Sequence, residues 1–156
     1  MNIEKYLVLN KYLLSLLGVS EFKDLQDKLK DVSDINDKDN YLDVLLIYFS
    51  NKINEANQSI ISQNNLYRYD ENIKGYVSII NRHREPIRLK YFQYLAVLFT
   101  EILLDNIKNN QTNFIYDLNE FLERYKKENK VEAINAFTEN DLNKIAFWMA
   151  TGSGKT

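Results

Sequence analysis

The sequence predicts a mainly α-helical chain whose last residues begin a separate α/β domain. Up to about residue 137, apolar residues recur at the three- and four-residue spacing of helices, and no segment alternates with the two-residue period of a half-buried strand. A short apolar run at 144–149 then precedes a glycine-containing motif at 152–156. We therefore expect a helical N-terminal domain over 1–85, a helical segment over 86–143, and the first strand of an α/β domain within 144–156.

The pattern of apolar residues in the N-terminal part of the sequence predicts two helices. Apolar residues repeat with helical spacing over 3–17, and Gly18 stands where a left-handed C-cap residue belongs. Ser20 is the expected N-cap of a short second helix through Phe22, Leu25 and Leu29, whose other positions are charged. The second helix should therefore cover one side of a core.

The aspartate-rich stretch 31–43 invites a calcium-loop interpretation. Counted from Asp34 as the first ligand, however, Asp39 occupies the place of the obligatory glycine and Leu45 that of the bidentate glutamate. Short polar runs between periodic segments are usually loops, so we expect a solvated linker.

Two more helices are expected before the middle of the chain. The third covers 41–56 and is dense in apolar residues, and the fourth covers about 66–82. The polar stretch 57–65 connects them, and Gly75 lies inside the fourth at some cost in helix propensity.

The sole basic cluster lies at 82–90, around the only proline, Pro86. Its cations suit a contact with nucleic-acid phosphates, and they also suit a solvated helix end, where positive charge stabilises the helix dipole. We favour the second interpretation and expect at most weak, salt-sensitive DNA binding. His83 has no cysteine or second histidine beside it, so a metal or catalytic role is not expected.

A buried helix is expected next, because 89–107 is apolar on nearly every face. An amphipathic helix over 114–125 follows, and then a charged loop at 126–130. After a polar turn at 138–143, the run at 144–149 is mostly apolar, as is typical of strands buried on both faces of a parallel sheet.

The motif at 152–156 has the residues of a phosphate-binding loop. Gly152 and Gly154 lack a Cβ, which lets the backbone adopt positive φ and bring its N–H groups close to phosphate oxygens. Lys155 would place its ammonium on the outer phosphates, and the hydroxyl of Thr156 would be a ligand of Mg²⁺. Only four glycines occur in the chain, so a glycine-rich background does not explain the motif.

The stretch 149–156 resembles motif I of superfamily 2 helicases, in particular of the DEAD/DEAH-box and type III restriction-subunit branch. In that branch the first glycine of the general loop, which is Met149 here, is commonly absent. The octet 89–96 resembles the short motif that lies upstream of motif I. Its glutamine, Gln93, can pair with both the donor and the acceptor edge of adenine. Gln93 and Gly152 lie further apart than is expected for this pair, which implies a folded insertion between them.

This resemblance implies a RecA-like ATPase domain that starts within 144–156 and is truncated there, so that the chain would be an N-terminal fragment of a longer protein. For the parent protein it implies ATP and Mg²⁺ as cofactors, DNA as a partner, and further subunits of a restriction or anti-phage complex. Lys155 would be catalytic and Thr156 the Mg²⁺ ligand. The implied nucleotide-binding residues are Gln93, Thr151, Gly152, Ser153, Gly154, Lys155 and Thr156. We expect the fragment alone neither to hydrolyse ATP nor to bind it tightly.

Composition narrows the class of protein. A chain of 156 residues with 45% hydrophobic and 13% aromatic residues can form a packed core. The net charge of −2 gives no global attraction to nucleic acid, and the absence of cysteine excludes a disulfide scaffold and a thiolate metal site. No apolar run reaches the roughly 20 residues that span a bilayer. Charged residues interrupt the apolar residues of the N-terminus, so a signal peptide is not expected. We expect a cytoplasmic protein with no membrane contact.

Three functions remain open from the sequence. The parent is an ATP-dependent DNA helicase or translocase, or it is another P-loop NTPase, which would be expected to keep the glycine that Met149 replaces. Alternatively, residues 1 to about 140 are an α-helical interaction module and the terminal motif is incidental. An Asp-Glu-x-His or Asp-Glu-x-Asp tetrad further along the parent sequence would favour the helicase.

Overall fold

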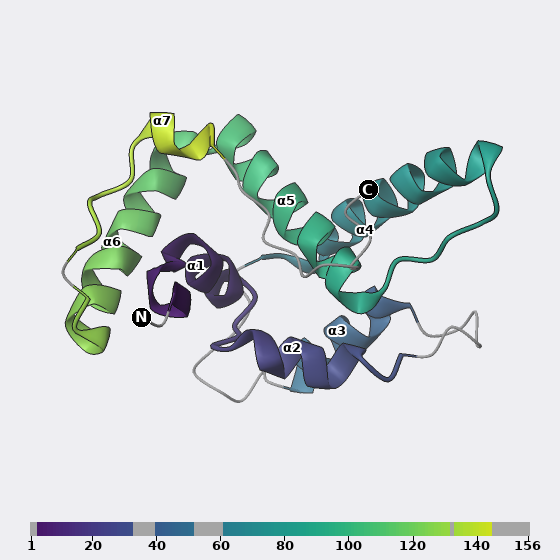
Figure 1. Cartoon of the computed structure of the whole chain (residues 1–156), viewed down its shortest axis with the longest axis horizontal. Helices are drawn as coiled ribbons and strands as arrows, with labels where there is room; N and C mark the ends of the chain where they lie inside the picture. The colour runs from purple at the N-terminus through teal and green to yellow at the C-terminus, as the bar shows by residue number, and fades with distance from the viewer. Residues whose placement is uncertain (1–2, 33–39, 52–60, 132, 145–156) are drawn as a thin grey trace.

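A computed structural model describes residues 3–32, 40–51, 61–131 and 133–144, and the described chain is mainly helical (Figure 1). No strand occurs in these ranges, which confirms the predicted mainly α class. The predicted strand and loop lie outside the described residues except for Lys144. The elements are η1 (Ile3–Tyr6), α1 (Val8–Leu16), α2 (Phe22–Leu29), α3 (Tyr41–Asn51), α4 (Gln63–Ile80), η2 (Asn81–His83), α5 (Tyr91–Asn109), α6 (Gln111–Asn129) and α7 (Glu139–Leu142).

The helix α5 lies at the centre of the arrangement. It packs against α1, α2, α4 and α6, and in Figure 1 it runs through the middle of the molecule from α3 towards α7. Its central position explains why 89–107 is apolar on nearly every face, because neighbouring helices cover it from several sides. The prediction of a buried helix is confirmed for the face that carries Tyr94, Leu95, Leu98, Ile102 and Leu103, whereas Leu104 is exposed.

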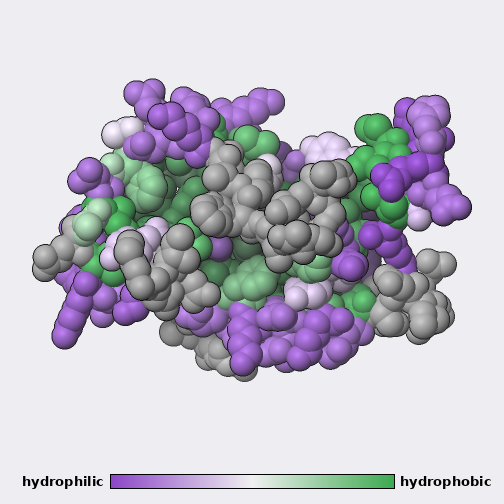
Figure 2. All heavy atoms as spheres, viewed as in Figure 1, coloured by the Kyte–Doolittle hydropathy of each residue, from purple (hydrophilic) through white to green (hydrophobic). Residues whose placement is uncertain are grey.

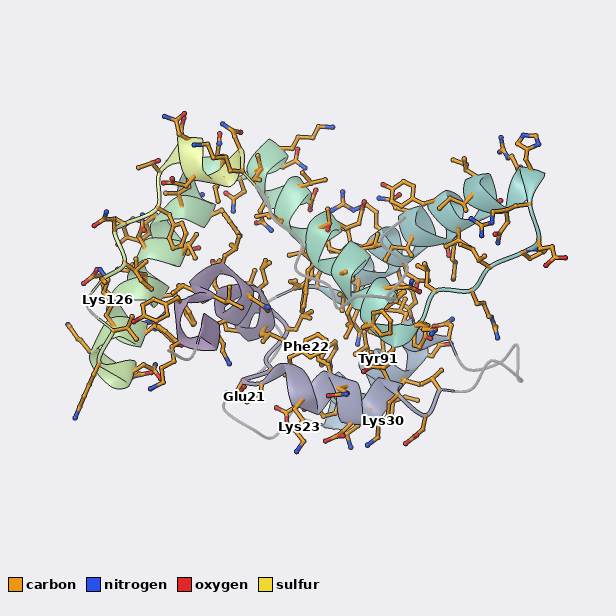
Figure 3. All side chains as sticks on the ribbon, in the orientation of Figure 1. Glu21, Phe22, Lys23, Lys30, Tyr91 and Lys126 are labelled. Carbon is orange, nitrogen blue, oxygen red and sulfur yellow. The ribbon has the colours of Figure 1, made fainter. Side chains whose placement is uncertain are left out.

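The helix α2 shows the predicted amphipathic character. Hydrophilic side chains gather over it at the lower edge of the face shown in Figure 2, while Leu25 and Leu29 on its other side are buried. A hydrogen bond also joins this helix to the start of α5, because Gln26 Nε2 donates to Tyr91 Oη at 3.0 Å; Figure 3 shows Tyr91 beside α2.

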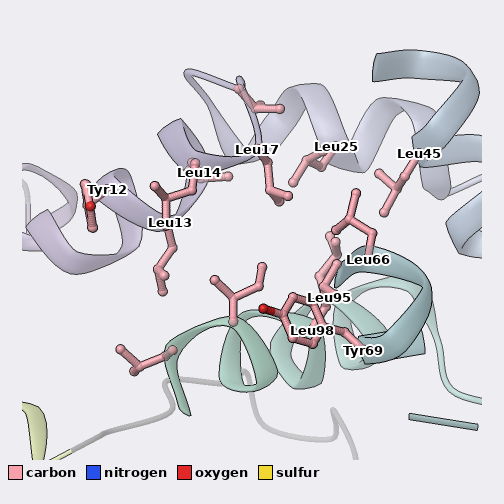
Figure 4. Close-up of a cluster of buried hydrophobic side chains, with 14 of the residues drawn as sticks. Tyr12, Leu13, Leu14, Leu17, Leu25, Leu45, Leu66, Tyr69, Leu95 and Leu98 are labelled. Atoms are coloured by element: carbon pink, nitrogen blue, oxygen red, sulfur yellow. The ribbon is translucent and has the colours of Figure 1, made fainter. Parts of the chain in front are cut away.

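One hydrophobic core extends through the described helices. Buried side chains from Val8 in α1 to Leu142 in α7 belong to it. Leu95 and Leu98 of α5 are fully buried at its centre, and Figure 4 shows them facing leucines from α1, α2 and α4. Burial of this apolar surface is the main favourable contribution to folding.

The ends of α1, α2 and α4 show which of the predicted capping residues are correct. Gly18 follows α1 with φ 69°, the left-handed conformation predicted for it. The hydroxyl of Ser62 accepts a hydrogen bond from the Asn65 N–H at 3.3 Å and so caps α4, which begins three residues earlier than predicted. The prediction that Ser20 is an N-cap is wrong, because Glu21 occupies that position and makes no side-chain cap.

The predicted charged loop at 126–130 is wrong over most of its length, because α6 continues to Asn129. Lys126 Nζ lies 2.9 Å from the Glu123 carboxylate one turn earlier, and Lys130 ends the helix with φ 53°. Cations in the last turn are stabilised by the negative end of the helix dipole, so the charge run extends the helix. The predicted polar turn at 138–143 similarly contains the short helix α7.

No helix in the described part of the chain has the length and apolar character that a membrane crossing requires.

Candidate functional site

Of the predicted nucleotide-binding residues, the structure describes only Gln93. The others, Thr151, Gly152, Ser153, Gly154, Lys155 and Thr156, lie outside the described residues. Gln93 lies close to the start of α5, next to the segment that leads into this helix.

Gln93 is half-buried in the first turn of α5. Its Oε1 accepts a hydrogen bond from the Lys90 N–H at 2.8 Å, so the amide satisfies a backbone donor at the point where the helix begins. The ammonium of Lys90 has no lone pair and cannot accept a hydrogen bond from the backbone of Gln93. Only one of the two hydrogen bonds of a capping box can therefore form. In this structure, then, the Gln93 carbonyl oxygen has a structural role.

The segment that leads into α5 is held in place by side chains. Asn81 binds the Ile87 backbone in both directions: its Nδ2 donates to the carbonyl at 3.1 Å, and its Oδ1 accepts from the N–H at 2.9 Å. The Tyr41 hydroxyl donates to the Leu89 carbonyl at 2.9 Å. These contacts fix an extended stretch that has no helix or strand bonds of its own.

A pocket of about 350 Å³ lies between this segment and α4. Its volume is at the small end of the roughly 300–1,000 Å³ usual for ligand sites. Asp70, Lys74 and Arg88 bring charge of both signs to it, and Gln93 is not among its lining residues. The lining consists of Val32, Asn40, Tyr41, Asp70, Ile73, Lys74, Val77, Ser78, Asn81, Arg88, Leu89 and Tyr94.

Asp70 is the one charged residue among the buried residues that the structure describes, and it is 2% exposed. The Tyr94 hydroxyl donates to its Oδ1 at 2.8 Å, and Lys74 Nζ lies 2.7 Å from its Oδ2. The second contact is an ion pair without the alignment of a hydrogen bond, and no described donor is hydrogen-bonded to Oδ2. Burial raises the pKa of Tyr94, and the adjacent Asp70 carboxyl raises it further.

A second carboxyl group joins the same two helices. Arg68 donates to both oxygens of Asp105, at 3.2 and 2.7 Å, and the Tyr69 hydroxyl donates to Oδ2 at 2.6 Å. Burial opposes ionisation of Asp105, but the hydrogen bonds from Arg68, Tyr69 and Asn109 outweigh it and lower its pKa. The hydrogen bonds from Tyr94 to Asp70 and from Tyr69 to Asp105 both join α4 to α5.

Sequence reasoning did not identify Asp70. The available signal was its position: Leu66, Tyr69 and Ile73 are the buried residues of α4, and Asp70 shares their helix face. A carboxyl group on an apolar stripe needs partners, which Tyr94 and Lys74 supply.

Alkaline pH is expected to destabilise the protein. Burial raises the pKa of Tyr12 to about 12, and it also raises the pKa of Tyr69 and Tyr94 above the ordinary value. The folded state therefore keeps phenolic protons that the unfolded chain releases above about pH 10, so this contribution to stability is complete below that pH and is lost as pH rises. Urea unfolding between about pH 8 and about pH 11 measures the loss.

The matched variants for this measurement are Tyr94→Phe and Tyr67→Phe. Tyr67 is exposed on α4. The first variant should reduce the alkaline loss and the second should leave it unchanged. Stability that stays constant across this range in the original protein would contradict the expectation.

Comparison of the chain with protein-family models, with curated proteins and with solved structures found no match.

Proposed function

We propose that the chain is the N-terminal part of an ATP-dependent DNA helicase or translocase of superfamily 2, such as the motor subunit of a restriction or other anti-phage system. The observation that carries the proposal is the sequence Gly152-Ser153-Gly154-Lys155-Thr156 directly after a mostly apolar run. Backbone N–H groups, a lysine ammonium and a hydroxyl are the groups that hold a triphosphate and its Mg²⁺. ATP hydrolysis that DNA stimulates and that requires Lys155 tests the proposal.

The proposed roles follow from the chemistry of each residue. Lys155 neutralises charge on the transferring phosphoryl group, and Thr156 contributes a hard oxygen ligand to Mg²⁺. The backbone of 151–154 approaches the phosphates, since Gly152 and Gly154 leave room for it. Gln93 selects adenine through the donor and acceptor of its amide.

A second candidate function is an α-helical interaction module, which the helical character of the described residues and their common core support. On that alternative the terminal motif has no role in nucleotide binding. The sequence of the parent protein distinguishes the two proposals. A helicase carries an Asp-Glu-x-His or Asp-Glu-x-Asp tetrad further along its sequence, and an interaction module does not.

The substitution Gln93→Glu separates base recognition from helix capping. Glutamate keeps the oxygen that accepts the Lys90 N–H, so the start of α5 should be preserved. It loses the amide donor, so we expect the preference for ATP over GTP to fall by about tenfold, the equivalent of one or two net hydrogen bonds. The measurement is the relative affinity for the two nucleotides in the parent protein.

Gln93→Ala is the matched comparison, because it removes both the cap and the amide. We expect it to lose base preference to the same extent and also about 1 kcal/mol of stability. A third variant, Gln26→Ala, removes another hydrogen-bonded helix glutamine and should keep base preference. Unchanged preference in both Gln93 variants would leave Gln93 with its structural role alone.

A further inference from the structure

The segment 82–90 carries an unusual concentration of positive charge. It holds three of the five arginines of the chain and its only histidine, with Glu85 as the sole acidic residue, although the net charge of the whole chain is −2. The side chains of Arg82, Arg84, Arg88 and Lys90 are all exposed. In Figure 2, hydrophilic side chains gather over this end of α4 at the right of the molecule, beside a small apolar patch.

The helix dipole accounts for only part of this cluster. Arg82 and His83 lie in the last turn that follows α4, where cations offset the negative end of the dipole. Arg84 begins the stretch beyond that turn, and Arg88 and Lys90 lie in the extended chain that leads to α5. The effect of a helix dipole falls off within its last turn, so it gives no reason for these later cations.

Two arginines of the segment make no ion pair or side-chain hydrogen bond within the described part of the chain. Other arginine and lysine side chains form ion pairs, as Arg68 does with Asp105 and Lys74 with Asp70. Among the described residues, neither Arg82 nor Arg84 makes an ion pair or a side-chain hydrogen bond. An external anion could therefore bind them without breaking a contact to any residue that the structure describes.

Hydrogen bonds from side chains hold the backbone in the second half of the segment. Asn81 forms two hydrogen bonds with the Ile87 backbone. The Tyr41 hydroxyl donates to the Leu89 carbonyl, and the Lys90 N–H donates to Gln93. Pro86 further restricts the chain. Because these bonds already hold Ile87, Leu89 and Lys90 and join Ile87 to Asn81, binding costs little backbone ordering entropy at these positions.

We propose that the segment 82–90 binds the phosphate backbone of nucleic acid without reading its sequence. Arginine favours this partner, because its planar guanidinium donates to two phosphate oxygens at once, whereas the lysine ammonium acts as a point charge. The segment belongs to the helical part of the chain and lies outside the sequence motif at 152–156. It does not depend on nucleotide binding.

The test uses the 156-residue chain and a fluorescently labelled DNA duplex of mixed sequence, with binding followed by anisotropy at low salt. Neutralising about three phosphates predicts a slope of log affinity against log salt of about −3, with the same affinity for a scrambled duplex. The double substitution Arg82→Gln with Arg84→Gln should weaken binding about tenfold and reduce the slope by about two.

The matched control is Lys108→Gln with Lys127→Gln, which makes the same change in net charge at exposed positions on α5 and α6. It should weaken binding by less than about twofold. Equal losses in the two double variants would overturn the proposal, because binding would then follow net charge. Absence of DNA binding at low salt would also overturn it.

Two further arms identify the partner and separate this proposal from the proposed function. Phosphatidylserine vesicles that bind as tightly as DNA, with the same dependence on Arg82 and Arg84, would overturn the assignment to nucleic acid. Lys155→Ala should leave DNA binding by this segment unchanged. Loss of binding in that variant would show that the loop at 152–156 carries the contact, and would overturn the assignment to 82–90.

Discussion

Replacing Leu98 with alanine is expected to lower the free energy of unfolding by about 2–5 kcal/mol. Leu98 is fully buried at the centre of α5, and the helices α1, α2, α4 and α6 pack against α5. The substitution removes apolar contacts and leaves a cavity that helices on several sides cannot easily close. Urea unfolding followed by circular dichroism measures the change.

The control for this experiment lies on the same helix. Leu104 is 48% exposed, so Leu104→Ala makes the same chemical change at a position that water already reaches. We expect it to alter stability by no more than about 0.5 kcal/mol. Similar losses in the two variants would contradict the central position of α5 in the core.

The helices that could be predicted are those whose pattern has one explanation. The stretch 89–107 has apolar residues on nearly every side, which suits a helix that packs against several others, and α5 packs against four helices. The conformation of Gly18 could be predicted in the same way, because glycine adopts the left-handed backbone conformation after a helix at little cost in free energy. In both cases local preference and tertiary packing favour the same structure.

The predictions that were wrong concern polar residues whose partners the sequence does not reveal. The charged stretch 126–130 was predicted as a loop, yet the pair between Lys126 and Glu123 and the helix dipole extend α6 through most of it. Ser20 has the chemistry of an N-cap, but α2 starts one residue later. Capping depends on backbone geometry to within one residue, which periodicity does not define.

The site could be predicted in its chemistry and not in its three-dimensional arrangement. Gln93 is predicted to recognise adenine, and the structure gives its carbonyl oxygen a helix-capping contact that the octet 89–96 does not suggest. The pocket beside α4 and the pairing of Asp70 with Tyr94 join residues far apart in the chain, so no local motif marks them. The residues Thr151 to Thr156 stay a prediction.

Lys155→Ala is expected to abolish ATP turnover by the parent protein, with a loss of at least about a hundredfold to a thousandfold. The ammonium of Lys155 is proposed to lie on the outer phosphates, where negative charge is redistributed as the phosphoryl group transfers. Alanine supplies no charge there, and water cannot replace a positioned cation in a closed site. We expect the fold to be unaffected, because the proposed role of Lys155 is a contact with phosphate.

The most direct measurement is therefore DNA-stimulated ATP hydrolysis by the parent protein, compared with its Lys155→Ala and Lys144→Ala variants. Lys144 is an exposed lysine shortly before the motif, so its removal makes the same charge change without touching the proposed loop. We predict that the parent protein and Lys144→Ala hydrolyse ATP at similar rates and that Lys155→Ala does not. Unchanged turnover in Lys155→Ala, or equal loss in both variants, would contradict the assignment of 152–156 as the phosphate-binding loop of a motor.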